Sequence, residues 1–268
     1  MKHGKMRNLS WQMYLLVVVI YIAIIQLGGL LIGAGIENDT DSSFPTVEVM
    51  MREAIIPIAL SVLFGALVAS WLGWWGEILT DRRPVQRWVR LVPIAMLIAA
   101  VIAIDYANLA DQAVGLVLSL LLLVVLVGIG EELMFRGIGV VSFRRDGFKE
   151  GRVALYTSLI FGLVHVTNAI TTGPQAIAQA IVVSLAGYFL YLSRRVGGGL
   201  LLPVVVHSTW DLGLISPELG PDPRAYLGAA VPVLALVGLG VLVIRRRRRI
   251  EPADENVTRG EPAPEPAI

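Results

Sequence analysis

The sequence predicts an all-α membrane protein with about eight transmembrane helices and with both termini on the cytoplasmic side. Of its 268 residues, 56% are hydrophobic and only 16% are charged, whereas soluble domains carry about 25% charged residues. Several apolar stretches approach or exceed about 18 residues, the length that spans a bilayer. The chain contains no cysteine, which excludes disulfides, thiolate metal sites and cysteine catalysis.

The first apolar stretch, residues 11–36, follows a basic N-terminus. It is too long for a signal peptide and lacks a small-residue cleavage site, so we expect a transmembrane helix. The fourth apolar stretch is longer than a bilayer needs, and we expect a break or tilt near residues 137–139. The spans after the first are predicted at residues 55–75, 88–106, 113–143, 153–170, 174–192, 199–215 and 226–244.

Lysine and arginine alternate along the chain in the way that the positive-inside rule requires. The connections after odd-numbered spans are mainly acidic, with only Arg52 and Arg224 as basic residues. The N-terminus, the even-numbered connections and the end of the last span are basic: Lys2, Lys5, Arg7, Arg82, Arg83, Arg87, Arg90, Arg144, Arg145, Lys149, Arg152, Arg194, Arg195 and residues 245–249. This pattern predicts a multi-pass protein of the cell membrane.

The predicted spans divide the chain into four parts. Residues 1–110 hold three N-terminal helices, residues 111–216 hold helices four to seven, and residues 217–249 hold helix eight with a basic anchor. The arginines of this anchor are expected at anionic lipid headgroups. Residues 250–268 are rich in proline and glutamate and are expected to be disordered. The expected partners are the lipid bilayer and a peptide, and no nucleic acid.

Three predicted spans contain ionisable residues, although a charged side chain at the bilayer centre costs about 2.5–3.5 kcal/mol on insertion scales. Glu131, His165 and His207 each lie 12 or 13 residues from the basic cytoplasmic end of their span. At about 1.5 Å per residue, this distance is about 18–20 Å, near the bilayer midplane. We therefore expect one buried site that contains Glu131, Glu132, Arg136, His165, His207 and Asp211.

Helical spacing sorts these residues by role. Glu132 and Arg136 are four residues apart, so they share a face and can neutralise each other. Glu131 is rotated by about 100° from Glu132 and has no partner in its own helix, which suits a general base. Phe161 is four residues before His165, so its ring is placed to wall one side of that imidazole.

His207 and Asp211 have the same spacing of four residues. Two arrangements are open: the two side chains hydrogen-bond to each other, or both point at one reacting oxygen. In either arrangement, a carboxylate and two imidazoles can supply a base, an oxyanion donor and a proton for a leaving amine.

The order of these motifs resembles the CPBP family, the CAAX-processing and bacteriocin-processing intramembrane endopeptidases. This family is also called Abi and is related to the Rce1 prenyl protease. The motifs are Glu-Glu-x-x-x-Arg at residues 131–136, Phe-x-x-x-His at 161–165 and His-x-x-x-Asp at 207–211. The resemblance covers about residues 116–214, and it includes the segment from Gly187 to the glycines at 197–199.

The resemblance implies a glutamate-dependent protease, with residues 111–216 as its catalytic core. Glu131 would activate water, and His165 would hold and polarise that water. His207 and the residue at 211 would face the oxyanion, and Glu132, Arg136 and Phe161 would support them. Many family members have asparagine where this chain has Asp211. An ionised aspartate would repel an oxyanion, so it would serve either when protonated or by orienting His207.

Several alternatives stay open at this point. Glu131, His165 and His207 could also bind zinc, but the helical His-Glu-x-x-His motif is absent, and we favour a site without metal or cofactor. A proton-linked transporter also places ionisable groups at the midplane, although no repeat is visible. A non-catalytic scaffold or immunity protein of the same fold is the third reading. The substrate would be a prenylated C-terminal peptide or a leader or membrane peptide.

Overall fold

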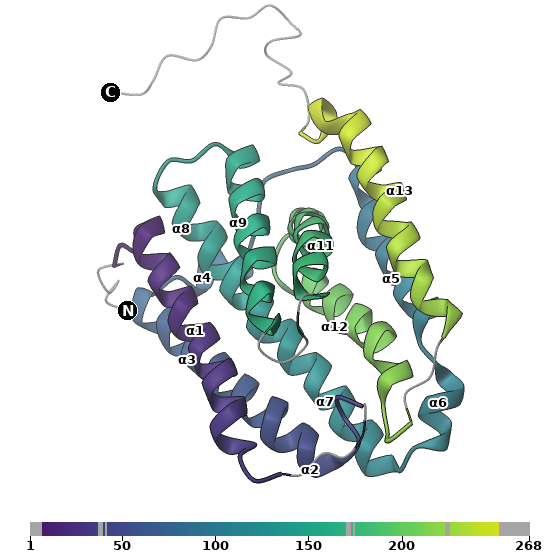
Figure 1. The fold of residues 1–268 in the computed structure, drawn as a ribbon. Helices are drawn as coiled ribbons and strands as arrows, with labels where there is room; N and C mark the ends of the chain where they lie inside the picture. Colours follow the sequence, from purple (N-terminus) through teal and green to yellow (C-terminus); the bar gives the residue numbers. More distant parts are fainter. Residues whose placement is uncertain are drawn as a thin grey trace, which may run out of the picture.

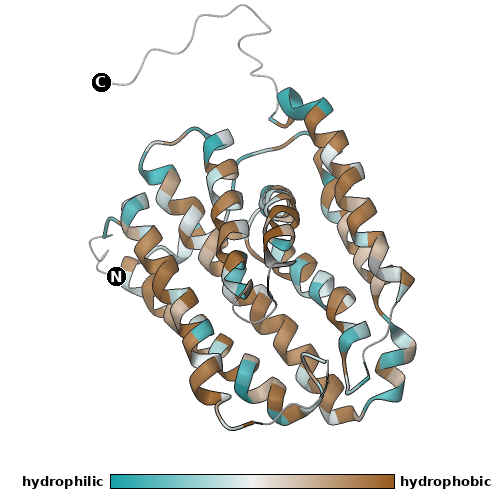
Figure 2. Cartoon of the chain, in the orientation of Figure 1, coloured by the Kyte–Doolittle hydropathy of each residue, from teal (hydrophilic) through white to brown (hydrophobic). Residues whose placement is uncertain are grey.

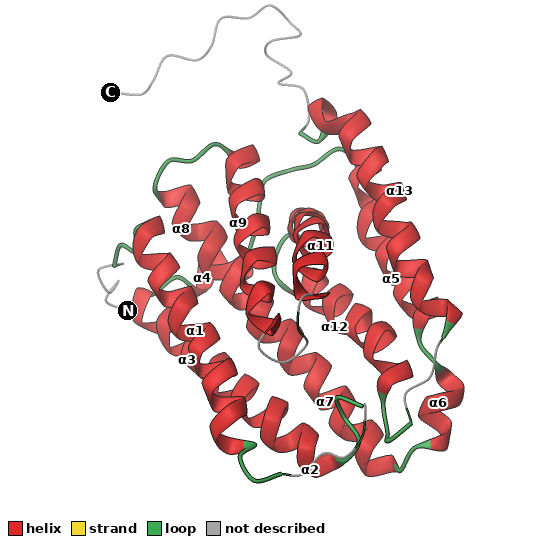
Figure 3. Cartoon of the chain, viewed as in Figure 1, coloured by secondary structure: helices red, strands yellow, loops and turns green. Residues whose placement is uncertain are grey.

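The computed structural model describes residues 7–36, 40, 42–169, 173, 175–222 and 226–251. Every regular element in this part of the chain is a helix (Figure 3), and one isolated bridge joins Phe44 to Leu219. The all-helical prediction is therefore confirmed. The predicted disordered tail, from residue 252 onward, lies outside the described residues.

The helices follow the predicted order. The larger ones are α1 (Trp11–Ile32), α3 (Ile56–Leu72), α5 (Leu91–Ala103), α7 (Val114–Glu131), α9 (Glu150–Val164), α11 (Gln175–Gly197), α12 (Leu201–Ile215) and α13 (Ala230–Arg246). Short segments connect or extend them: α2 (Val47–Val49), η1 (Met50–Ile55), α4 (Trp75–Leu79), η2 (Arg87–Arg90), α6 (Tyr106–Asp111), η3 (Glu132–Gly139), α8 (Val140–Arg145), η4 (His165–Asn168), η5 (Ser216–Glu218), η6 (Leu227–Ala229) and η7 (Arg247–Arg249).

Apolar side chains cover much of the outer surface of the helices (Figure 2). Large ones such as Leu31, Val114 and Ile181 are more than two-thirds exposed, which suits contact with lipid. Four helical stretches in the described part are long and apolar enough to cross a membrane: Trp11–Ile32, Val47–Leu72, Val114–Arg145 and Ile177–Gly197. The chain is thus a membrane protein by composition and helix length, while the count of about eight spans and the orientation of the termini stay predictions.

The long fourth span does not break where the sequence suggested. It continues from Val114 to Arg145, but it widens into a π-helix between Glu132 and Gly139. A π-helix inserts extra residues into the turns of an α-helix, and such insertions are frequent at functional sites. Every residue of this π-helix is buried. The widening therefore falls in the interior, directly after Glu131.

The π-helix is enclosed by other helices and packs against α1, α3, α4, α9 and α11. In Figure 1, α1 and α3 lie side by side, α11 is central, and α5 and α13 form the opposite side. Helix α11 packs against α9 and α12, and α12 also packs against α7. As a result, the ends of α7 and α9 and the middle of α12 are neighbours.

A buried ion network joins the basic ends of several helices. Arg194 is fully buried, and its guanidinium lies 3.2 Å from a carboxylate oxygen of Asp81. Arg144 lies 2.8 Å from the same oxygen. Arg194 also donates to the carbonyl oxygen of Ile78 at 2.6 Å. Because α11 continues to Gly197, Arg194 lies in its last turn rather than in the connection that the sequence suggested.

Candidate active site

The two adjacent glutamates at the end of α7 have different environments. The side chain of Glu132 is completely buried, whereas that of Glu131 keeps 18% of its surface exposed. Neighbouring residues in a helix are rotated by about 100°, so they point in different directions. Glu132 therefore faces the protein interior, and Glu131 reaches a cavity that is described below.

Glu132 and Arg136 form the ion pair that the sequence predicted, with 2.8 Å between Oε1 and Nη1. Arg136 is also completely buried, and its Nη2 donates to the carbonyl oxygen of Gly187 at 3.0 Å. Its guanidinium carbon lies 4.0 Å from the centroid of the Phe161 ring, in cation–π geometry. A buried ion pair needs such additional partners to offset its desolvation.

Gly187 makes this arrangement possible. A Cβ atom at this position would lie 3.0 Å from Arg136 Nη2 and 2.9 Å from Phe161 Cδ1. A larger residue would therefore push the guanidinium away from both its carbonyl partner and its aromatic partner.

His207 links the two glutamates. Its Nδ1 lies 2.8 Å from Glu132 Oε1 and its Nε2 lies 3.6 Å from Glu131 Oε2. The Nε2 atom is also 3.6 Å from Asp211 Oδ2. Because a carboxylate only accepts hydrogen bonds, Nδ1 carries the hydrogen and donates a hydrogen bond to Glu132. The same second nitrogen is left to face both Glu131 and Asp211.

His165 is the first residue after α9. Its Nδ1 lies 2.7 Å from the carbonyl oxygen of Phe161, so this nitrogen also donates. The Phe161 ring packs edge-on against His165, at 5.0 Å between centroids, and against His207, at 5.8 Å. Phe161 thus contacts both imidazoles, whereas the sequence spacing predicted a contact with His165 alone.

A cavity of about 800 Å³ contains both Glu131 and His165 in its lining. It lies between α1, η1, α7 and η4 and also includes Gln26 and Glu53. This volume is within the usual range of ligand pockets. The buried Oε2 of Glu131 has no hydrogen-bond partner in the described part of the protein. This oxygen is therefore available to accept a proton.

The described residues contain no group of three or more histidine, cysteine, aspartate or glutamate side chains arranged to hold a metal ion. In both imidazoles, Nδ1 is occupied by a hydrogen bond to protein oxygen. A site without metal or cofactor stays a prediction and is tested below.

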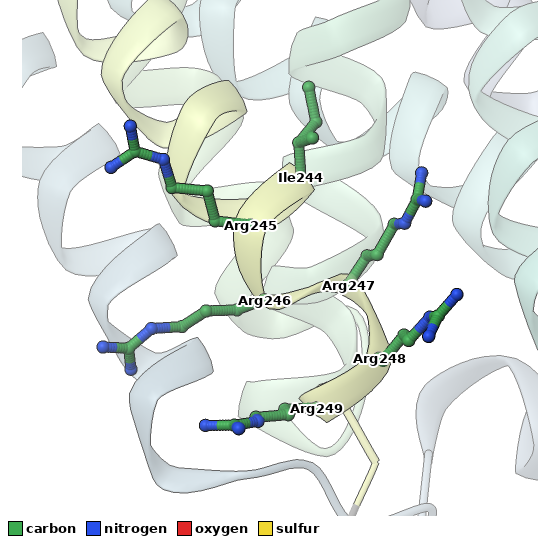
Figure 4. Close-up of a pocket in the computed structure, with 6 residues that line it drawn as sticks. All are labelled: Ile244, Arg245, Arg246, Arg247, Arg248 and Arg249. Carbon is green, nitrogen blue, oxygen red and sulfur yellow. The ribbon is translucent and has the colours of Figure 1, made fainter.

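A second cavity, of about 670 Å³, lies at the end of α13 and contains none of these residues. Its lining consists of Ile244 and the arginines at 245–249, whose side chains point in different directions (Figure 4). No carboxylate belongs to its described lining.

The structure thus brings Glu131, Glu132, His207 and Asp211 together directly, and it connects His165 to them through Phe161 and the shared cavity. Sequence spacing did not reveal that Glu132 binds His207 or that Gly187 binds Arg136. Both contacts join different helices, which spacing within one helix cannot show.

Comparison with known proteins gives one family match. The model described as "Type II CAAX prenyl endopeptidase Rce1-like" matches residues 113–213. No curated protein and no solved structure matches the chain significantly. The matched segment contains every candidate site residue named above, from Glu131 to Asp211. Residues 113–213 therefore form an Rce1-like segment, which confirms the resemblance to the CPBP family and indicates a hydrolase of the protease type.

Proposed function

We propose that this protein is an intramembrane endopeptidase in which Glu131 activates water, with assistance from His165 and His207. The Rce1-like segment supports a protease that acts on peptides. The observation that carries the finer proposal is the position of Glu131. Its Oε2 lies 3.6 Å from His207 Nε2, and its side chain lines the same cavity as His165.

In the proposed reaction, the carboxylate of Glu131 takes a proton from water as the oxygen attacks the peptide carbonyl carbon. His165, whose Nδ1 donates to Phe161, presents its other nitrogen to hold this water. The tetrahedral intermediate collapses when the C–N bond breaks, and Glu131 returns the proton to the leaving amine. One water is consumed, and one acid and one amine are formed.

His207 is the proposed donor to the oxyanion. Three carboxylates lie within 3.6 Å of its ring nitrogens, and they stabilise a positive charge on the imidazole. Glu132 fixes the ring through Nδ1, which leaves Nε2–H to face the developing negative charge. Asp211 approaches the same nitrogen, so we assign it the role of orienting His207 rather than binding the oxyanion itself.

The proposed placement is multi-pass, with both termini cytoplasmic, and the proposed reaction uses no metal. The alternation of basic and acidic connections along the sequence supports this placement. The transporter and scaffold readings are distinguished by the experiment below, because neither requires peptide hydrolysis.

The test uses the full chain in lipid nanodiscs and follows cleavage of membrane peptides by mass spectrometry. Glu131→Gln, His165→Ala and His207→Ala are each expected to lower kcat by at least about 100-fold, while helical content stays unchanged. Glu77→Gln is the matched control, because Glu77 pairs with Arg145 away from the cavity. Cleavage by Glu131→Gln at the wild-type rate would refute the proposal.

A further inference from the structure

The arginines at 245–249 end α13 and form η7. All five are exposed, and together with Ile244 they line the cavity of about 670 Å³ at this end of the molecule. In the described part of the chain, no carboxylate forms an ion pair with these five side chains. The first acidic residue that follows them, Glu251, lies 3.5 Å from Arg195 instead. The run therefore carries a positive charge that the described residues do not neutralise.

Other arginines at the same end of the molecule are neutralised within the protein. Arg144 and Arg194 lie 2.8 Å and 3.2 Å from Asp81 Oδ2, and Arg145 pairs with Glu77. These ion pairs join segments that are far apart in the sequence, so the arginines in them serve packing. The arginines at 245–249 make no such pair with described residues, and their charge is available to a partner.

The backbone of the arginine run is held in place by η2 and the residue before it. Trp88 Nε1 donates to the carbonyl oxygen of Arg249 at 2.7 Å, and the backbone N–H of Gln86 donates to that of Ile250 at 2.9 Å. The guanidinium carbon of Arg246 lies 5.7 Å from the centroid of the Trp88 ring, within the range of a cation–π contact. Tryptophan is enriched where helices meet the membrane surface. The run is thus a fixed surface beside a residue type that is typical of this interface.

An apolar strip runs along α13 toward the arginines. Leu234, Val237, Val241 and Ile244 are 45–69% exposed, and their spacing of three or four residues places them on one face of the helix. Other residues of α13 pack against α5. In Figure 2, the hydrophilic end of α13 lies directly beyond its hydrophobic length. This face therefore offers an apolar strip and, at the end of the strip, a group of guanidinium cations.

This combination matches the two parts of an anionic phospholipid. Guanidinium groups bind phosphate oxygens through paired hydrogen bonds, and acyl chains are as apolar as the leucine and valine side chains of the strip. Figure 4 shows Arg247 and Arg248 extending to one side of the helix end and Arg245 and Arg246 to the other. Side chains that spread in this way reach several headgroups in a plane rather than enclosing one ion.

We propose that the end of α13 and η7 bind anionic phospholipids selectively. The phosphates would lie at the arginines of 245–249, and the acyl chains would lie along the strip from Leu234 to Ile244. A soluble phosphate or a nucleic acid would leave this strip unused. The surface thus retains negatively charged lipids beside α13, in addition to the topological role that basic residues have in membrane proteins. This inference does not depend on the proposed peptidase function.

The test uses the full chain, which contains no cysteine, so one introduced thiol is labelled without background. Val241→Cys carries a bimane fluorophore on the apolar strip. The matched probe is Leu31→Cys, on the exposed end of α1 at the opposite end of the molecule (Figure 1). Each protein is placed in bilayers of phosphatidylglycerol and phosphatidylcholine, in which one lipid or the other bears a nitroxide quencher. Quenching is expected to favour phosphatidylglycerol by at least about fivefold at position 241 and by less than about twofold at position 31.

Two triple variants separate charge from packing. Arg247→Gln/Arg248→Gln/Arg249→Gln is expected to lower the preference at position 241 to below about twofold. Arg247→Lys/Arg248→Lys/Arg249→Lys keeps the charge and is expected to keep most of the preference. Nitroxide lipids occupy both leaflets, so the ratio between the two lipids does not depend on the orientation of the protein in the bilayer.

Equal quenching by both lipids at position 241 would overturn the proposal, and so would a preference that survives in the glutamine variant. Loss of the preference in both triple variants would also overturn it, because η7 would then act through packing rather than charge.

Two further measurements test other occupants of the surface. Inorganic phosphate, added at constant ionic strength, is expected to leave the preference unchanged; if it abolishes the preference, the arginines bind a free anion instead. Asp254→Asn/Glu255→Gln removes two negative charges that follow the run in the sequence. This variant is expected to keep the wild-type preference, and a marked increase would make the acidic end of the chain the occupant in place of lipid.

Discussion

The imidazole of His207 is held by Glu132 through a contact of 2.8 Å between Nδ1 and Oε1. The same oxygen accepts a hydrogen bond from Arg136 at 2.8 Å. The second glutamate of the pair therefore connects the cation of its own helix with the histidine of another. Its position determines the direction in which His207 presents its remaining nitrogen to Glu131.

Glu132→Gln is expected to lower kcat by about 100-fold, because the amide no longer stabilises a charged His207. It should also destabilise the fold by about 3–5 kcal/mol, since Arg136 keeps a buried, unpaired charge. Thermal unfolding in detergent measures the second effect. The double variant Glu132→Gln/Arg136→Met should regain much of the stability but none of the activity. Recovery of activity in the double variant would assign Glu132 a purely structural role.

Gly187→Ala is expected to destabilise the protein by about 1–3 kcal/mol, because the added methyl group overlaps Arg136 and Phe161. Gly151→Ala is the matched control. A Cβ at Gly151 meets nothing within 4 Å, and alanine is the better helix former by about 0.5–1 kcal/mol. Chemical denaturation of both variants measures the contrast. Equal stability of the two variants would mean that Arg136 and Phe161 can move aside for a methyl group at position 187.

Asp211→Asn should retain activity within about tenfold of wild type, because asparagine can still orient His207 through its side-chain oxygen. Asp211→Leu has a similar size but no hydrogen-bonding group and should lose about 100-fold in kcat. The cleavage assay in nanodiscs measures both. A larger loss in Asp211→Asn than in Asp211→Leu would contradict the positioning role.

Acid stability depends on Asp81. Burial alone raises the pKa of its carboxyl, but Arg144 and Arg194 outweigh burial and hold the pKa below its ordinary value. A carboxyl with a depressed folded pKa stabilises the protein fully above its unfolded pKa of about 3.9 and loses that effect as pH falls through the folded pKa. Wild type should therefore lose stability below about pH 4 more steeply than Asp81→Asn. Unfolding midpoints between pH 6 and pH 2 measure the difference, and parallel curves would contradict it.

Removal of divalent metal tests the metal-free proposal. Dialysis against EDTA and addition of 1,10-phenanthroline are expected to leave kcat unchanged, because the described residues form no metal-binding group. A loss of activity that added zinc restores would show that Glu131, His165 and His207 rearrange around an ion.

The sequence predicted which ionisable residues lie near one another, but it did not predict the contacts between them. Apolar length and the distance from basic ends placed Glu131, His165 and His207 at one depth. The structure brings the first and third of these to 3.6 Å and places the second in the same cavity. Composition and charge patterning suffice for such predictions because lipid imposes strong constraints on every span.

Apolar length and charge patterning did not predict the contacts between side chains of different helices. Glu132 and His207 lie on different helices, so spacing within one helix could not show that they meet. Arg194 was interpreted as a charge in a connection, yet it is buried against Asp81. Positive charges near a membrane serve both topology and packing, and the sequence alone does not separate these uses.

Helix α1 contributes Gln26 to the wall of the cavity, although it lies outside the Rce1-like segment. Under the proposed function, the hydrolytic groups and part of the surface that would meet the substrate are encoded in separate stretches of the gene. Changes in the first helix would then alter which peptides are admitted and leave the proposed chemistry intact. Grafting α1 from a relative would exchange selectivity alone.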